Sequence, residues 1–240
     1  MSEEGVSASR PARAPTTRVA AARARSIAST RRRPGQPYPI VLDLRGRSCL
    51  VVGGGPVAER KVEGLLEAGA AVTVVSPRLT PRLRDWIGRS RCRYLAREYR
   101  SRDVAGRAIV LVATDDDRVT ARVQRDARRA GVLVNAADDP ERCDFFLPAI
   151  LRRGRLTVAV STGGASPALA RAVRDELEGL VPESYALLLE VVAGVRAQVR
   201  GRADQIPPGR WIEAIDGRLR ALVADGQAAE ATTLLSRRLA

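Results

Sequence analysis

The chain has 240 residues, of which 45% are apolar and only 3% aromatic, so a core built mainly from Val, Leu, Ile and Ala is expected. No run approaches the roughly 18–20 consecutive apolar residues of a membrane span, and the N-terminus lacks a signal peptide's apolar segment, so a cytoplasmic protein is expected. Three scattered cysteines and no histidine argue against a zinc site or a disulfide framework, and no metal site is predicted.

The net charge of +14 comes almost entirely from arginine. Residues 1–34 carry eight arginines against two glutamates and show little apolar periodicity, which predicts a disordered Arg-rich arm. Such an excess suits a polyanionic partner, either nucleic acid or a small molecule with several carboxylates. A surface of solvated arginines in an arginine-rich proteome explains the same composition.

Between residues 35 and 148, apolar runs alternate with helical patterns. Strands are predicted at 48–52, 71–75, 92–95, 108–113 and 132–135, and helices at 56–69, 81–88 and 119–130. This alternation predicts an α/β fold, a Rossmann-like doubly wound parallel sheet.

The pattern changes after residue 148. Two strands are predicted at 145–150 and 156–161, joined through residues 152–154, and a helix is expected to begin at Pro167 with Ser166 as its N-cap. Further helices are predicted over 184–200 and 209–239. These elements predict a small α+β region over 149–182 and a C-terminal helical region over 183–240.

A glycine-rich turn follows the first predicted strand. Gly53, Gly55 and Ala58 match G-x-G-x-x-A between a strand and a helix, the setting in which this motif binds a dinucleotide. The glycines allow close approach of a pyrophosphate to the helix N-terminus. The acidic residue that usually follows the second strand is replaced by Ser76-Pro77-Arg78, so the charge pattern leaves NADP open beside NAD.

Several blocks of sequence together point to one family. Val-Gly-Gly-Gly-Pro-Val-Ala-Glu-Arg-Lys at 52–61 resembles the opening motif of precorrin-2 dehydrogenases, a family that includes the N-terminal part of bacterial siroheme synthase. Blocks at 113–116, 135–138, 145–149 and 160–167 follow in that family's order and at similar spacing. The resemblance covers about residues 37–200.

The resemblance implies an NAD-binding Rossmann domain over 35–148, a dimerisation region over 149–182 and a homodimer. It implies oxidation of precorrin-2 to sirohydrochlorin with NAD+ as hydride acceptor, in siroheme or cobalamin biosynthesis. Some family members also insert Fe2+, and this activity stays open. The chain ends too early to hold the methyltransferase domain of bacterial siroheme synthase, so it resembles the stand-alone type.

The candidate site residues fall into three groups. The resemblance assigns the catalytic role to Asp138. The glycine motif, the charge pattern and the resemblance together predict these cofactor contacts: Gly53, Gly55, Pro56, Val57, Ser76, Arg78, Leu79, Thr114 and Asp115. The predicted tetrapyrrole contacts are Asn135, Ser161, Thr162, Gly163, Gly164 and Ser166.

The residues by themselves also make Asp138 a candidate base. It follows a predicted strand at the end where doubly wound sheets bind their ligands. Without histidine, acid–base chemistry falls to carboxylates, Tyr, Cys or the single lysine, Lys61. The alternative is that Asp138, beside Asp139-Pro140, is only a turn residue.

Other interpretations compete at several positions. Residues 114–117 and 161–166 have the side chains expected of helix caps, and Arg152, Arg153 and Arg155 are either carboxylate ligands or solvated surface. A regulator that senses NAD and binds nucleic acid through its basic arm is the alternative function. The arm lacks interleaved aromatic residues and no helix-turn-helix pattern precedes the Rossmann unit, so nucleic acid is not the expected partner.

Overall fold

The computed structural model describes residues 36–136, 143–199, 201 and 205–240. The predicted arm over 1–34 and the candidate base Asp138 lie outside the described residues. The chain divides into two units, Met1–Pro39 and Ile40–Ala240, and every helix and strand below belongs to the second. No helix in the described ranges combines the length and the apolar character needed to cross a membrane.

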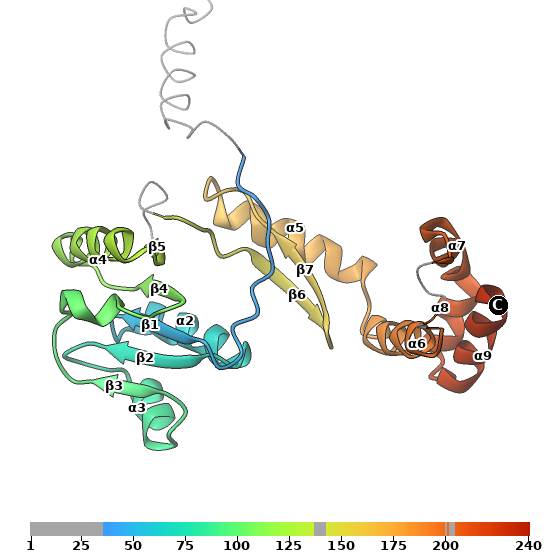
Figure 1. The fold of residues 1–240 in the computed structure, drawn as a ribbon, viewed down its shortest axis with the longest axis horizontal. Helices are drawn as coiled ribbons and strands as arrows, with labels where there is room; N and C mark the ends of the chain where they lie inside the picture. Colours follow the sequence, from blue (N-terminus) through green and yellow to red (C-terminus); the bar gives the residue numbers. More distant parts are fainter. Residues whose placement is uncertain (1–35, 137–142, 200, 202–204) are drawn as a thin grey trace, which may run out of the picture. The chain divides into compact units, whose positions relative to one another are not determined.

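Five parallel strands form the main sheet in the order β3-β2-β1-β4-β5 (Figure 1). Their bounds are β1 Ser48–Val52, β2 Ala71–Val75, β3 Arg93–Leu95, β4 Ile109–Val112 and β5 Leu133–Ala136. Val52 pairs with both Val75 and Val112, so the carboxyl ends of the three central strands lie level. The predicted Rossmann-like sheet is confirmed.

Residues of β1 alternate between two cores because successive strand side chains point to opposite faces. Cys49 and Val51 join the core formed with α2 (Pro56–Glu67) and α3 (Pro81–Gly88). Leu50 and Val52 join the core formed with α4 (Asp117–Ala130) and the 3-10 turn η1 (Ser101–Val104). Each fully buried Leu or Val side chain contributes about 1.5–3 kcal/mol, so this double coverage stabilises the strand ends that carry the site.

A separate hairpin follows the main sheet and pairs β6 (Ala149–Arg153) with β7 (Leu156–Val160) in antiparallel register. The strand predicted at 145–150 is wrong at both ends. It begins only at Ala149, because Phe145 and Phe146 pack against the two cores of the main sheet. It continues to Arg153, whose buried guanidinium donates to the Val181 carbonyl oxygen at 2.8 Å, so the turn falls at Gly154.

Helix α5 (Pro167–Leu180) follows the hairpin, and four further helices complete the described chain. They are α6 Tyr185–Gln198, α7 Pro208–Ala214, α8 Gly217–Ala224 and α9 Ala228–Leu239. The helical stretch predicted over 209–239 is therefore three short helices. Asp216 caps α8 through the Leu219 amide at 2.9 Å, and Gly226 lies within the α8–α9 turn with a φ of 75°.

Candidate cofactor and substrate site

The carboxyl ends of β1, β2 and β4 meet at the glycine-rich turn. The Gly53 amide donates to the Val75 carbonyl at 3.0 Å, and the Ala113 amide donates to the Val52 carbonyl at 2.7 Å. The strand order reverses between β1 and β4, because β2 and β3 lie on one side and β5 on the other. Open α/β sheets bind their ligands at such a switch point.

Two of the three glycines in this turn are required by packing. Gly53 has a φ of 122°, and a Cβ there would lie 2.0 Å from the Ala113 carbonyl oxygen. A Cβ on Gly54 would lie 2.0 Å from the Arg78 carbonyl oxygen. Any side chain at either position would push apart the loops that follow β2 and β4.

The third glycine, Gly55, faces open space. Its φ of −88° is accessible to any residue, and a Cβ there would meet no atom within 4 Å. It is the N-cap of α2, whose first turn begins with Pro56 and receives no side-chain cap. A bare helix N-terminus with room in front of it fits the pyrophosphate of a dinucleotide.

A cavity of about 380 Å³ lies over this turn. It is lined by residues from the turn and from the segments after β2 and β4: Gly53, Gly54, Gly55, Ser76, Arg78, Leu79, Thr80, Ala113, Thr114 and Asp115. Seven of the nine predicted cofactor residues are in that set, whereas Pro56 and Val57 are not. The sequence prediction missed Gly54, Thr80 and Ala113; the structure shows Thr80 as the N-cap of α3.

The loop after β2 is held by its own hydrogen bonds. Ser76 is buried, and its hydroxyl donates to the Arg78 carbonyl at 2.6 Å. The Tyr94 hydroxyl donates to the Ser76 carbonyl at 2.9 Å. Ser76 therefore shapes the cavity wall, while the exposed Arg78 supplies positive charge at the place where many NAD sites have a carboxylate.

The acidic run after β4 divides between two roles. Asp116 caps α4, because its Oδ1 accepts hydrogen bonds from the amides of Arg118 at 2.8 Å and Val119 at 3.2 Å. Asp115 is exposed, lines the cavity and is the one carboxylate among its described lining residues. The predicted cap and the predicted cavity contact thus fall on neighbouring residues.

Beyond β5, a second set of contacts joins the chain on either side of residues 137–142. The Val134 amide donates to the Asp144 carboxylate at 3.0 Å, and the Asp144 amide returns a bond to the Val134 carbonyl at 2.8 Å. The Cys143 thiol accepts from the Ala136 amide at 3.2 Å and donates to its carbonyl at 3.1 Å. We call the residues joined here the β5 clamp: Val134, Asn135, Ala136, Cys143, Asp144 and Phe145.

Asn135, a predicted substrate contact, is the buried centre of this clamp. Its Nδ2 donates to the Phe145 carbonyl at 2.9 Å, and its Oδ1 accepts a hydrogen bond of 2.6 Å from Lys61 Nζ. Asn135 as a whole residue is only 7% exposed. The sequence did not predict the Lys61 contact, because the two residues are 74 positions apart.

The loop from Ser161 to Ser166 uses its hydroxyls on its own backbone. Ser166 caps α5 through the Leu169 amide at 3.2 Å, and Thr162 Oγ1 accepts from the Ser166 amide at 3.0 Å. Gly163 and Gly164 have positive φ angles of 61° and 83°, which allow the turn. None of these residues lines the cavity, and their contact with a substrate stays a prediction.

Among the residues that the structure describes, no group of three or more His, Cys, Asp or Glu side chains is arranged to hold a metal ion.

Two family models match consecutive parts of the chain. The family described as NAD(P)-binding matches residues 40–149, and the family described as "Sirohaem biosynthesis protein central" matches residues 153–180. The first match contains the sheet and the cavity, and the second contains most of the hairpin and all of α5.

Siroheme synthases are similar to the chain over most of its length. That of Nitrosococcus oceani is 40% identical over 198 residues, which are 82% of this chain and 42% of the relative. That of Methylobacillus flagellatus is 41% identical over 194 residues, 80% of this chain and 42% of the relative. The chain thus spans less than half the length of these curated relatives.

A solved structure titled "SirC, precorrin-2 dehydrogenase" is 30% identical to the chain with a TM-score of 0.69. The match covers 84% of this chain and 100% of SirC. Because the match covers 84% of this chain, the likeness extends well beyond residues 40–149.

Proposed function

We propose a function from one premise: the chain belongs to the precorrin-2 dehydrogenase family that includes SirC. We infer that it oxidises precorrin-2 to sirohydrochlorin with NAD+ as hydride acceptor, in siroheme or cobalamin biosynthesis. The observation that carries this proposal is the match along the whole of SirC, which extends well beyond residues 40–149 of this chain. A shared Rossmann unit alone would support only nucleotide binding.

The residues of the turn after β1 are proposed to bind the cofactor. The α2 N-terminus and Gly55 would receive the pyrophosphate, and Pro56 and Val57 would follow it along the helix start. Thr114 and Asp115 lie across the cavity, where their oxygens would accept hydrogen bonds from ribose hydroxyls. When bound, NAD+ supplies the hydride acceptor of the reaction.

NAD+ rather than NADP+ is proposed as the acceptor. The carboxylate of Asp115 in the same cavity disfavours a further phosphate, whereas Arg78 favours one, so the choice depends on which charge lies nearer the ribose. Dissociation constants for both cofactors, measured with the wild type and Arg78→Ala, decide it. If the wild type binds NADP+ more than tenfold tighter than NAD+, and Arg78→Ala loses this preference, NADP+ is the acceptor instead.

Asp138 is proposed as the base that accepts the proton released when the hydride leaves. A carboxylate serves this purpose, and the chain has no histidine to compete for the role. We propose that the tetrapyrrole lies beside Asn135 and the loop from Ser161 to Ser166. The positive end of the α5 helix dipole, which lies behind this glycine-containing loop, suits a carboxylate of the substrate.

A homodimer is proposed because the hairpin and α5 leave apolar surface uncovered. In the described chain β6 and β7 pair only with each other, and α5 buries only Ala170. Leu169 and Leu180 are 55% and 71% exposed. They are eleven positions apart, close to three full turns of helix, so they lie on the same side of α5. A two-stranded hairpin is marginally stable alone, so a second copy of the chain is the proposed cover.

An anaerobic assay of the purified protein with precorrin-2 and NAD+ tests the dehydrogenase proposal directly. We expect sirohydrochlorin absorbance to grow together with NADH, and we expect Asp138→Ala to bind NAD+ normally but lose most turnover. Cofactor binding without any turnover by the wild type would refute the proposal, and normal turnover by Asp138→Ala would remove that residue from it. Later addition of Fe2+ tests iron insertion: a shift to siroheme absorbance would add that activity.

A further inference from the structure

The single lysine of the chain lies on the face of α2 that packs against the sheet. Ala58, Lys61, Val62 and Leu65 follow at the i, i+3, i+4, i+7 spacing of one helix face, and the three apolar members are buried. Lys61 is partly buried among them. A charged group in an apolar stripe costs free energy unless it is hydrogen-bonded, so packing alone does not account for this residue.

The composition makes the choice of lysine at position 61 informative. The chain has 41 basic side chains, and every one except Lys61 is arginine. Lysine presents a compact ammonium with three donors, whereas arginine presents a wide planar fork. The rest of the chain uses arginine, so the lysine at position 61 indicates a site that suits the smaller cation.

The ammonium of Lys61 connects α2 to the centre of the β5 clamp. Its Nζ donates to Asn135 Oδ1 at 2.6 Å, a short charge-assisted bond, and Asn135 Nδ2 in turn donates to the Phe145 carbonyl at 2.9 Å. The contact joins α2, whose N-cap is Gly55, to both chain segments that flank residues 137–142. It also fixes the orientation of the Asn135 amide, because its oxygen must face the ammonium and its nitrogen the carbonyl.

We propose that Lys61 is a positioning residue for the dehydrogenation. Its ammonium holds the Asn135 amide and with it the β5 clamp, so that Ala136 and Cys143, the described residues on either side of the segment carrying Asp138, keep fixed positions relative to the N-terminus of α2. This inference rests on the proposed function. Loss of the ammonium is expected to slow proton removal without weakening cofactor binding, because the cavity lining does not include Lys61 or Asn135.

Kinetics of substitutions at position 61 test the proposal. Lys61→Met keeps the length and apolar stem of the side chain but removes the charge, and we expect at least a tenfold lower kcat. The Kd for NAD+ should stay within twofold, because neither Lys61 nor Asn135 lines the cofactor cavity. Lys61→Arg should fail to restore the wild-type kcat, because the larger fork does not fit the 2.6 Å contact. Lys61→Gln, which keeps a neutral donor, should lie between wild type and Lys61→Met.

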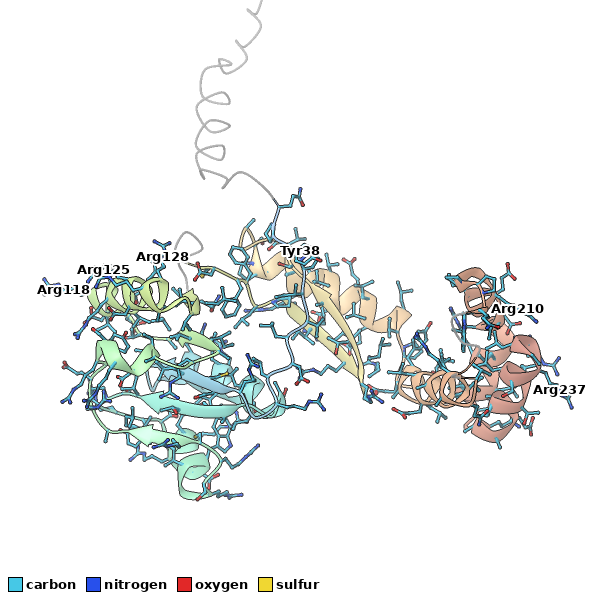
Figure 2. The ribbon with its side chains drawn as sticks, viewed as in Figure 1. Tyr38, Arg118, Arg125, Arg128, Arg210 and Arg237 are labelled. Carbon is cyan, nitrogen blue, oxygen red and sulfur yellow. The ribbon has the colours of Figure 1, made fainter. Side chains whose placement is uncertain are left out.

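Arg125→Met is the matched control, since it makes the same change of charge on an exposed residue. Figure 2 shows Arg125 on the outward side of α4, beside Arg118 and Arg128. Its kcat should equal that of the wild type. A wild-type kcat for Lys61→Met would overturn the proposal. So would a parallel loss of melting temperature and NAD+ affinity, since that pattern indicates a general structural role.

Hydrogen exchange tests the positioning without any turnover. The amides of Val134, Ala136 and Asp144 donate within the β5 clamp, and their exchange should rise about tenfold in Lys61→Met but not in Arg125→Met. Unchanged exchange in Lys61→Met would overturn the proposal. A wild type inactive on precorrin-2 would refute the proposed reaction, whereas the exchange data would still decide whether Lys61 holds the clamp.

Discussion

The five-stranded sheet and the β6–β7 hairpin differ in how their surfaces are covered. Four of the five β1 residues are buried, because helices of the same chain lie on both faces of the sheet. In the hairpin only Leu151 and Arg153 are buried, and no residue of β7 is. The sheet therefore completes its core within one chain, whereas the hairpin and α5 leave surface exposed that we propose a second copy of the chain covers.

The largest expected effect is in the main sheet, whose core is complete within one chain. Gly53→Ala places a Cβ 2.0 Å from the Ala113 carbonyl at a φ of 122°, so overpacking and backbone strain should together lower the free energy of unfolding by about 3 kcal/mol. Urea unfolding followed by fluorescence of the buried Trp86, in a Trp211→Phe background, measures it. Gly64→Ala on α2 is the control, because its Cβ meets nothing and should be neutral or stabilising.

On the exposed surface of α5, the double change Leu169→Glu with Leu180→Glu should separate the proposed dimer. Each leucine covered by a partner contributes about 1.5–3 kcal/mol, so the dimer Kd should rise at least about 100-fold. Sedimentation velocity measures the shift. The melting temperature of the main sheet should stay constant, and a wild type that already sediments as a monomer would end the proposal.

A smaller effect separates Gly55, the glycine proposed to contact the ligand, from the two glycines that packing requires. Gly55→Ala should fold with an unchanged melting temperature, because its Cβ meets no protein atom. The methyl group would occupy the space in front of the α2 N-terminus, and we expect about tenfold weaker NAD+ binding, or about 1.4 kcal/mol. Calorimetric titration measures this, and equal affinity for wild type and variant would show that the pyrophosphate lies elsewhere.

The smallest effect concerns the C-terminal helices. Paired hydrogen bonds from Arg238 at 2.8 Å lower the pKa of Asp216 from 3.8 to about 2. A carboxyl with a lowered pKa in the folded state stabilises fully above pH 3.8, and this stabilisation is lost as the pH falls through about 2. Melting curves by circular dichroism should show that loss for the wild type between pH 4 and 2, as set by these pKa values. Asp216→Asn keeps the α8 cap but has no carboxyl to titrate. If this variant lost melting temperature with falling pH as steeply as the wild type, Asp216 would not be the cause.

The sequence by itself determined the sheet, the glycine turn and most of the cavity lining. Each of these depends on residues close together in the chain: alternating apolar runs, the spacing of Gly53 and Gly55, and the segments that directly follow β2 and β4. Local spacing fixes strand type and turn geometry, and parallel strands place their carboxyl ends at one edge.

Only the tertiary structure decided how neighbouring residues divide their roles. It assigns Asp116 to the α4 cap and Asp115 to the cavity, and it separates Gly55 from Gly53 by what a Cβ would meet. It extends β6 to Arg153 because a carbonyl 28 residues away accepts the guanidinium. The contact between Lys61 and Asn135 spans 74 residues, and no local pattern encodes it, because it exists only when α2 packs on the face of the sheet to which Asn135 points.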